Sequence, residues 1–162
     1  MWFSRGALVL LLALTACGFH LRGDPSMGLK SLHVSVVGAS GVSTEIRRTL
    51  ATGPTKLMPS PKDAQAHLRI LSEVRDKNVY TITGTGRVYE FQLRLAVRYE
   101  LLAPGREMAV IAPAELESRR IITYSETAPI AKEAEEQVLY KDMQAEIAGR
   151  ILRQVALAAR DL

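Results

Sequence analysis

The sequence predicts an α+β domain in which two helices pack on one face of a four-stranded, mainly antiparallel sheet. Residues 88–101 alternate between apolar and polar side chains, the period of a strand with one buried face. Residues 129–162 repeat apolar side chains at intervals of three and four, as an amphipathic helix does. The expected order is strand-helix-strand-strand-strand-helix.

The first strand and helix are expected near the start of the domain. Residues 32–37 form a short valine-rich run that is typical of a buried strand. Residues 41–50 carry the apolar spacing of a helix, which Ser43 or Thr44 could cap. Gly53, followed by proline, ends this helix.

Three further strands precede the last helix. Residues 67–75 alternate in polarity except near Leu71, and the segment 80–82 can extend this strand. The glycines of residues 83–86 favour a tight hairpin turn before the strand 88–101. Residues 114–124 are expected to be the last strand.

The N-terminus resembles the signal peptide of a bacterial lipoprotein. A short apolar run ends in Leu14-Thr15-Ala16-Cys17, which is similar to the lipobox in which the cysteine is lipidated. The run is shorter than the roughly 20 apolar residues that span a bilayer. We therefore expect residues 1–16 to be removed, residues 17–30 to form a lipidated tether and residues 31–162 to form a single domain. The alternative is an ordinary signal peptide with a chance cysteine.

The residue after Cys17 is Gly18 and not an acidic residue. By resemblance to enterobacterial lipoproteins, this favours attachment to the periplasmic side of the outer membrane through the lipid anchor. The formal net charge of +4 is dispersed along the chain, whereas nucleic-acid-binding proteins carry a denser basic stripe. Anionic lipid or lipopolysaccharide is the acidic partner expected in that compartment.

Catalytic and metal-binding motifs are not recognisable in the sequence. His20, His33 and His67 lack metal-ligand spacing, and no serine lies in a Gly-x-Ser-x-Gly elbow. We therefore expect no enzyme activity, no cofactor and no metal.

Basic residues of the expected sheet and its turns leave two readings open. They could bind lipid phosphates or an acidic protein surface, because arginine donates paired hydrogen bonds to phosphate. They could instead form a solvated face with Glu90 and Glu100 as ion-pair partners. The set comprises Arg69, Arg75, Lys77, Arg87, Arg94, Arg98, Arg119 and Arg120.

The segment Cys17-Gly18-Phe19-His20-Leu21-Arg22 closely resembles the start of LptE, the lipoprotein subunit of the outer-membrane lipopolysaccharide translocon. Shorter likenesses follow at residues 89–92 (Tyr-Glu-Phe-Gln), at residues 104–106 (Pro-Gly-Arg) and at residues 132–143. The resemblance covers essentially the whole mature chain.

This resemblance implies a non-enzymatic protein with two helices on a four-stranded sheet. Such a protein plugs the large β-barrel LptD, assists its assembly and contacts lipopolysaccharide. Lys132 aligns with a family lysine implicated in lipopolysaccharide binding, and Arg87 lies near a second basic position that falls at Gly84 here. The alternative is a periplasmic lipid or peptide carrier without a barrel partner, whose groove would be lined by residues such as Phe91, Leu95 and Ile147.

Overall fold

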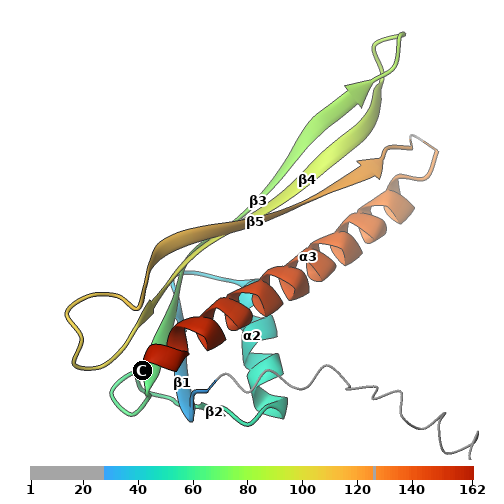
Figure 1. Cartoon of the computed structure of the whole chain (residues 1–162). Coiled ribbons are helices and arrows are strands. Elements are labelled where there is room, and N and C mark those ends of the chain that lie inside the picture. The colour runs from blue at the N-terminus through green and yellow to red at the C-terminus, as the bar shows by residue number, and fades with distance from the viewer. Residues whose placement is uncertain (1–27, 126) are drawn as a thin grey trace, which may run out of the picture.

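The computed structural model describes residues 28–125 and 127–162, and it confirms the α+β class with two helices and a single sheet (Figure 1). The elements are β1 (Ser31–Val36), α2 (Gly41–Thr52), β2 (Lys56–Leu57), β3 (Ala66–Ile82), β4 (Val88–Leu102), β5 (Ile111–Thr123), α3 (Pro129–Ala158) and a short 3₁₀ helix, η1 (Ala159–Asp161). Cys17, the predicted lipidation site, and most of the predicted tether lie outside the described residues.

The sheet has five strands in the order β2-β1-β3-β4-β5, so the prediction of four strands is wrong. The additional strand is β2, whose Lys56 and Leu57 pair in parallel with Ser31 and Leu32 of β1. β1 also runs parallel to β3, whereas β3, β4 and β5 are antiparallel. A strand of two residues shows no periodicity, which is why the pattern could not reveal β2.

The β3–β4 hairpin is the longest feature of the sheet. β3 runs from Ala66 to Ile82, so it joins the predicted strand 67–75 and its predicted extension 80–82 in one strand. Its pairing with β4 shifts between Ile70 and Ser72, where the sequence pattern is also disturbed, and shifts again after Val79. Such bulges change which side chains face the core, so a strand that contains them loses its simple alternation.

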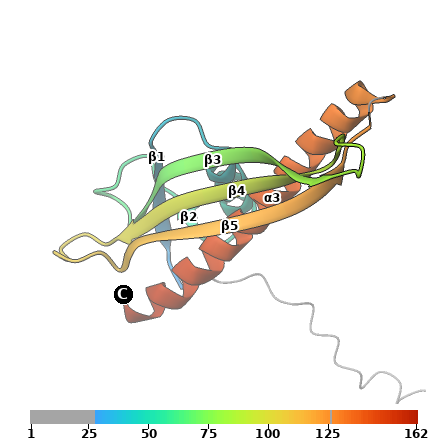
Figure 2. The same cartoon turned by 90° about the horizontal axis from the view of Figure 1, so that it is seen from above.

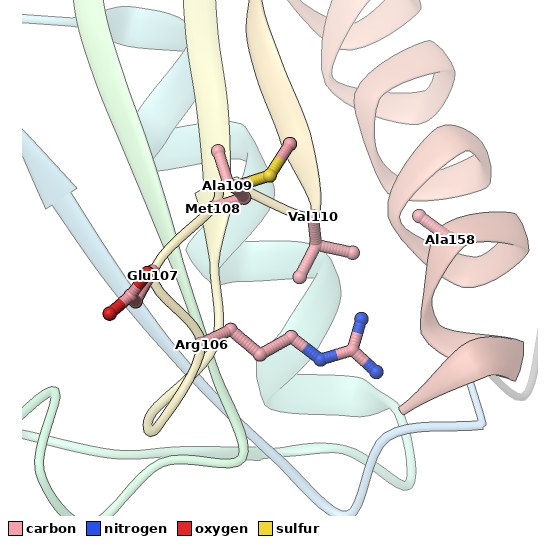
Figure 3. Close-up of a pocket in the computed structure, with 6 residues that line it drawn as sticks. All are labelled: Arg106, Glu107, Met108, Ala109, Val110 and Ala158. Carbon is pink, nitrogen blue, oxygen red and sulfur yellow. The ribbon is translucent and has the colours of Figure 1, made fainter.

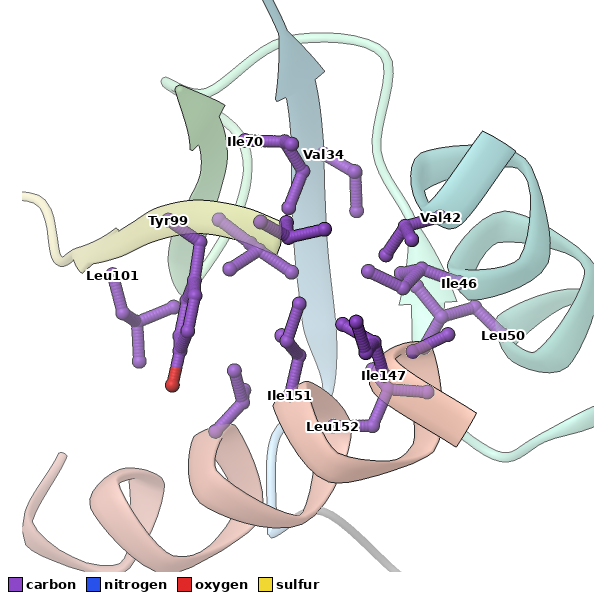
Figure 4. Packing of buried hydrophobic residues seen from close by; sticks show 14 of the residues in the cluster. Val34, Val42, Ile46, Leu50, Ile70, Tyr99, Leu101, Ile147, Ile151 and Leu152 are labelled. Carbon is purple, nitrogen blue, oxygen red and sulfur yellow. The ribbon is translucent and has the colours of Figure 1, made fainter. Parts of the chain in front are cut away.

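Both helices cover the same face of the sheet, and the hydrophobic core lies between the two layers (Figures 1 and 2). The predicted inner face of β4 is confirmed from Leu93 to Leu101, where alternate side chains are fully buried. Figure 4 shows Val42, Ile46 and Leu50 of α2 packing toward Ile147 of α3. At the other end of β4 the same face opens to solvent, because Tyr89 is 53% exposed.

The N-terminus of α2 is capped by Ser40 and not by the predicted Ser43 or Thr44. Ser40 has an extended backbone and its Oγ accepts a hydrogen bond from the Ser43 N–H at 3.0 Å. Ser43 lies inside the helix, where its hydroxyl donates to the Ser40 carbonyl oxygen. Three neighbouring hydroxyl residues all suit a cap, and only the backbone conformation distinguishes them.

The carboxylate of Glu73 connects the N-terminus of α2 with β3 of the sheet and with α3. Glu73 of β3 accepts hydrogen bonds from the Ser40 hydroxyl at 2.6 Å, the Val42 N–H at 3.0 Å and the Gln144 amide at 2.8 Å. Its side chain is 4% exposed. Glu73 therefore fixes the start of α2 against α3 and the sheet.

Candidate functional site

Arg87 lies at the tip of the β3–β4 hairpin, where two hydrogen bonds with Thr83 close the turn. The Thr83 N–H donates to the Arg87 carbonyl oxygen at 2.7 Å, and the Arg87 N–H donates to Thr83 Oγ1 at 3.1 Å. Gly86 has φ +81°, a conformation that glycine adopts without strain. The turn thus places Arg87 directly before the start of β4.

Lys132 lies in the first turn of α3, which begins with Pro129 at a favoured position. Its Nζ donates to Thr123 Oγ1 of β5 at 3.0 Å and to Glu135 Oε2 at 2.8 Å. Thr123 pairs with Glu90 of β4. The side chain of Lys132 therefore contacts the sheet close to the hairpin.

The tip of the β3–β4 hairpin and the start of α3, the elements that carry Arg87 and Lys132, lie at the same end of the molecule, opposite the C-terminus (Figures 1 and 2). Their roles as lipopolysaccharide contacts stay predictions, as does lipidation of Cys17, which lies outside the described residues.

The basic residues of the sheet are divided between its two faces. On the helix-covered face, Lys77 pairs with Glu136 of α3 at 2.6 Å and Arg120 pairs with Glu146 of α3 at 2.6 Å. Arg75 lies over the ring of another α3 residue, Tyr140, at 5.2 Å. These three side chains therefore contact α3 as well as the sheet.

The uncovered face carries a network of opposite charges centred on Arg94. This guanidinium reaches Asp76 of β3 at 2.9 Å and Glu115 and Glu117 of β5 at 3.2 and 2.8 Å. Hydrogen bonds to Glu117 and Asp76 raise the pKa of Arg94, and the reciprocal bond lowers the pKa of Glu117. The face is therefore polar with charges that balance locally.

The prediction that Glu90 and Glu100 are ion-pair partners of the basic residues is confirmed for Glu100 only. Glu100 pairs with Arg69 at 2.8 Å, as expected. Glu90 instead accepts a hydrogen bond from the Thr81 hydroxyl at 2.8 Å.

An apolar area on the helix-covered face near the hairpin was not predicted as a surface. Phe91 packs edge-on against Tyr124 with ring centroids 5.6 Å apart, and the Lys77 Nζ lies 4.6 Å from the Phe91 centroid. Val79 pairs with Phe91 and is 53% exposed. The alternation of residues 88–101 places Tyr89 and Phe91 on the apolar face of the strand. It wrongly suggested that this face is buried as far as Tyr89, which is 53% exposed.

His33 and His67 each contact a neighbouring segment of the chain. His33 Nδ1 lies 2.9 Å from the Met58 carbonyl oxygen, and His67 Nε2 lies 2.7 Å from Ser35 Oγ. Burial lowers the pKa of His67, and the nearby His33 lowers it further. Within residues 28–125 and 127–162, no three histidine, cysteine or acidic side chains are grouped to hold a metal.

The groove expected of a carrier does not form where it was predicted. Leu95 and Ile147 are fully buried in the core and Phe91 packs against it. An open hollow of about 700 Å³ lies elsewhere, between the β4–β5 loop and the end of α3 (Figure 3). It is lined by Arg106, Glu107, Met108, Ala109, Val110 and Ala158.

In the described part of the chain, no helix combines the length and apolarity needed to cross a membrane.

Known proteins match this chain over most of its length. A protein of Pectobacterium atrosepticum named LPS-assembly lipoprotein LptE is 26% identical, and the match covers 93% of this chain and 81% of that protein. A protein of Yersinia enterocolitica with the same name is 30% identical, and the match covers 91% of this chain and 74% of that protein. The solution structure of an uncharacterized lipoprotein B from Nitrosomonas europaea has a TM-score of 0.72 and 28% identity, covering 86% of this chain and 90% of that one. The crystal structure of rare lipoprotein B from Shewanella oneidensis has a TM-score of 0.71 and 25% identity, covering 81% and 97%. The family model described as "LptE: Lipopolysaccharide-assembly" matches residues 29–155. The chain therefore belongs to the LptE family.

Proposed function

We propose that this lipopolysaccharide-assembly lipoprotein plugs an LptD-type β-barrel and assists its assembly, so that lipopolysaccharide can be inserted into the outer leaflet. Membership of a non-enzymatic family confirms that the chain is not an enzyme. Cys17 would hold the chain at the periplasmic side of the outer membrane, and Arg87 and Lys132 would contact lipopolysaccharide directly.

The observation that carries the plug proposal is the uncovered face of the sheet. Three long strands expose this face, and the Arg94 network supplies donors and acceptors of both signs across it. The interior wall of a large outer-membrane barrel is polar, because inward side chains alternate with lipid-facing ones. A polar face with balanced charge suits such a wall better than a lipid surface or a single acidic ligand.

Arg87 and Lys132 are proposed as lipid contacts because both lie at the hairpin end and carry donors that phosphate accepts. Lys132 already donates to Thr123 and Glu135. A phosphate at this position would compete with the Glu135 carboxylate. Replacing both basic residues with glutamate should therefore weaken lipopolysaccharide binding while the fold is retained, as judged by thermal unfolding. Unchanged binding would remove them from the site.

The plug is tested by affinity purification from outer membranes in mild detergent, with a tag after Leu162. We expect one large β-barrel protein in equal amount that survives salt washes. Recovery of the tagged chain alone, with bound lipid, would contradict the plug and favour the carrier. The carrier is the weaker candidate, because Leu95 and Ile147 fill the core where its groove was expected.

A further inference from the structure

The hairpin end carries an exposed apolar patch on the helix-covered side of the sheet. The patch consists of Val79 of β3, Tyr89 and Phe91 of β4, and Tyr124, which follows β5. Val79, Tyr89 and Tyr124 are 53%, 53% and 39% exposed. Val79 pairs with Phe91, whose ring centroid lies 5.6 Å from that of Tyr124, and the Tyr124 N–H donates to the Tyr89 carbonyl oxygen at 2.8 Å, so the four residues are adjacent in the sheet.

This patch remains open because the first turns of α3 turn polar side chains toward the sheet. Farther along, Met143 and Ile147 of α3 are fully buried. In the first turns, Glu136 contacts the sheet instead, through Lys77. A carboxylate that pairs with a cation cannot seal apolar rings from water as an aliphatic side chain would. The sheet therefore exposes large apolar side chains next to an ion pair.

Cations border the patch on several sides. The Lys77 Nζ lies 4.6 Å from the centroid of Phe91. Lys132 contacts Thr123, the residue before Tyr124. Arg87 lies in the hairpin turn directly before β4, two positions before Tyr89. Apolar rings bordered by ammonium and guanidinium groups match a ligand whose acyl chains adjoin anionic groups.

We propose that the patch binds acyl chains of the lipopolysaccharide whose phosphates Arg87 and Lys132 contact. This inference rests on the proposed function, since it assigns a second part of the same ligand to the same end of the molecule. An apolar partner surface without charge would not require the bordering cations. A phosphorylated sugar without chains would leave the exposed rings unused.

The chain supplies a matched pair of variants for the test. Val79 and Val74 lie on the same strand with exposed fractions of 53% and 46%. Val79 pairs with Phe91, whereas Val74 pairs with Ala96 on the opposite face. Val79→Ser and Val74→Ser therefore make the same chemical change on opposite sides of the sheet. Val79→Thr keeps the side-chain shape and serves if Val79→Ser unfolds.

The experiment measures equilibrium binding of the full-length chain to lipid A and to its fully deacylated, phosphorylated disaccharide. We expect lipid A to bind at least tenfold more tightly than the disaccharide. Val79→Ser should weaken lipid A binding about fivefold, since it removes part of an apolar contact, and Val74→Ser should leave it unchanged. Neither substitution should alter binding of the disaccharide.

The other outcomes separate the two proposals. Equal affinity for both ligands, lowered by Arg87→Glu but not by Val79→Ser, would overturn the acyl-chain inference and keep the phosphate contact. Absence of binding to either ligand would refute direct contact altogether. If Val79→Ser reduced recovery of the barrel but left lipid A affinity intact, the patch would be a protein contact and the inference would be wrong.

Discussion

Replacing Glu73 by alanine should destabilise the domain more than any substitution of an exposed ion pair. The carboxylate is 4% exposed and accepts three hydrogen bonds, from Ser40, the Val42 N–H and Gln144. Alanine would leave these donors without their acceptor in a nearly buried place. Such a loss costs roughly 3–5 kcal/mol, which corresponds to about 10–18 °C in Tm for a domain of this size.

The assay is urea unfolding monitored by circular dichroism, with Glu45→Ala as the control. Glu45 pairs on α2 with Arg48, whose side chain is 73% exposed, and a pair open to solvent in this way contributes less than about 1 kcal/mol. We expect Glu73→Ala to lower the free energy of unfolding by several times the effect of the control. Equal effects of the two substitutions would refute the idea that Glu73 joins the helices to the sheet.

The same carboxylate should make stability depend on pH. Burial raises the pKa of Glu73, but hydrogen bonds from Ser40, Val42 and Gln144, together with Arg75, outweigh it and lower the pKa overall. Because the folded-state pKa is depressed, the stabilisation is present above the ordinary glutamate pKa of about 4.3 and is lost as the pH falls through the lower folded value. The stability difference between the wild type and Glu73→Gln should therefore shrink on acidification. A constant difference from pH 7 to pH 3 would contradict this assignment.

Three further predictions concern packing and the sheet edge. Tyr99→Phe should maintain or raise Tm in a thermal scan, because the buried Tyr99 hydroxyl has no hydrogen-bond partner among the described residues; a loss above about 1 kcal/mol would indicate a missing partner. Gly41→Ala should destabilise the domain by about 1–3 kcal/mol in urea unfolding, and less in a Gln144→Ala background, because its Cβ would lie 1.9 Å from the Gln144 amide nitrogen. Arg150→Ala should increase self-association in sedimentation velocity, since it frees the Glu117 carbonyl oxygen on edge strand β5; an unchanged monomer would show that the edge is protected by other means.

Sequence reasoning succeeded where one period persists over many residues. The alternation of β4 and the apolar stripe of α3 identified both elements, and burial of Leu93 through Leu101 confirms the central part of the β4 inner face. The same reasoning could not find β2, whose two residues carry no period. Of β3 it identified the segments 67–75 and 80–82 but not residues 76–79 between them, because polar residues and register shifts hide the pattern there.

The sequence proposes residues for the candidate site but does not show how they are arranged. Arg87 and Lys132 were identified by family resemblance, and only the pairing of β4 with β5 brings Thr123, and hence Lys132, to the hairpin end. Val79 lay between two predicted strand segments and was assigned no role. Its place beside Phe91 follows from the β3–β4 register, which alternation alone does not define.

The two faces of the sheet imply that the proposed partners are contacted separately. Charges around Arg94 balance across the uncovered face, so this face offers little net attraction to an anion. Lys77 lies beside the Phe91 ring, which packs against Tyr124, on the helix-covered side. If the uncovered face meets the barrel wall, substitutions at Arg94 should reduce barrel recovery without changing lipid affinity, and substitutions at Arg87 should do the reverse. A single site serving both partners would couple the two effects, and the opposite faces of one sheet argue against that coupling.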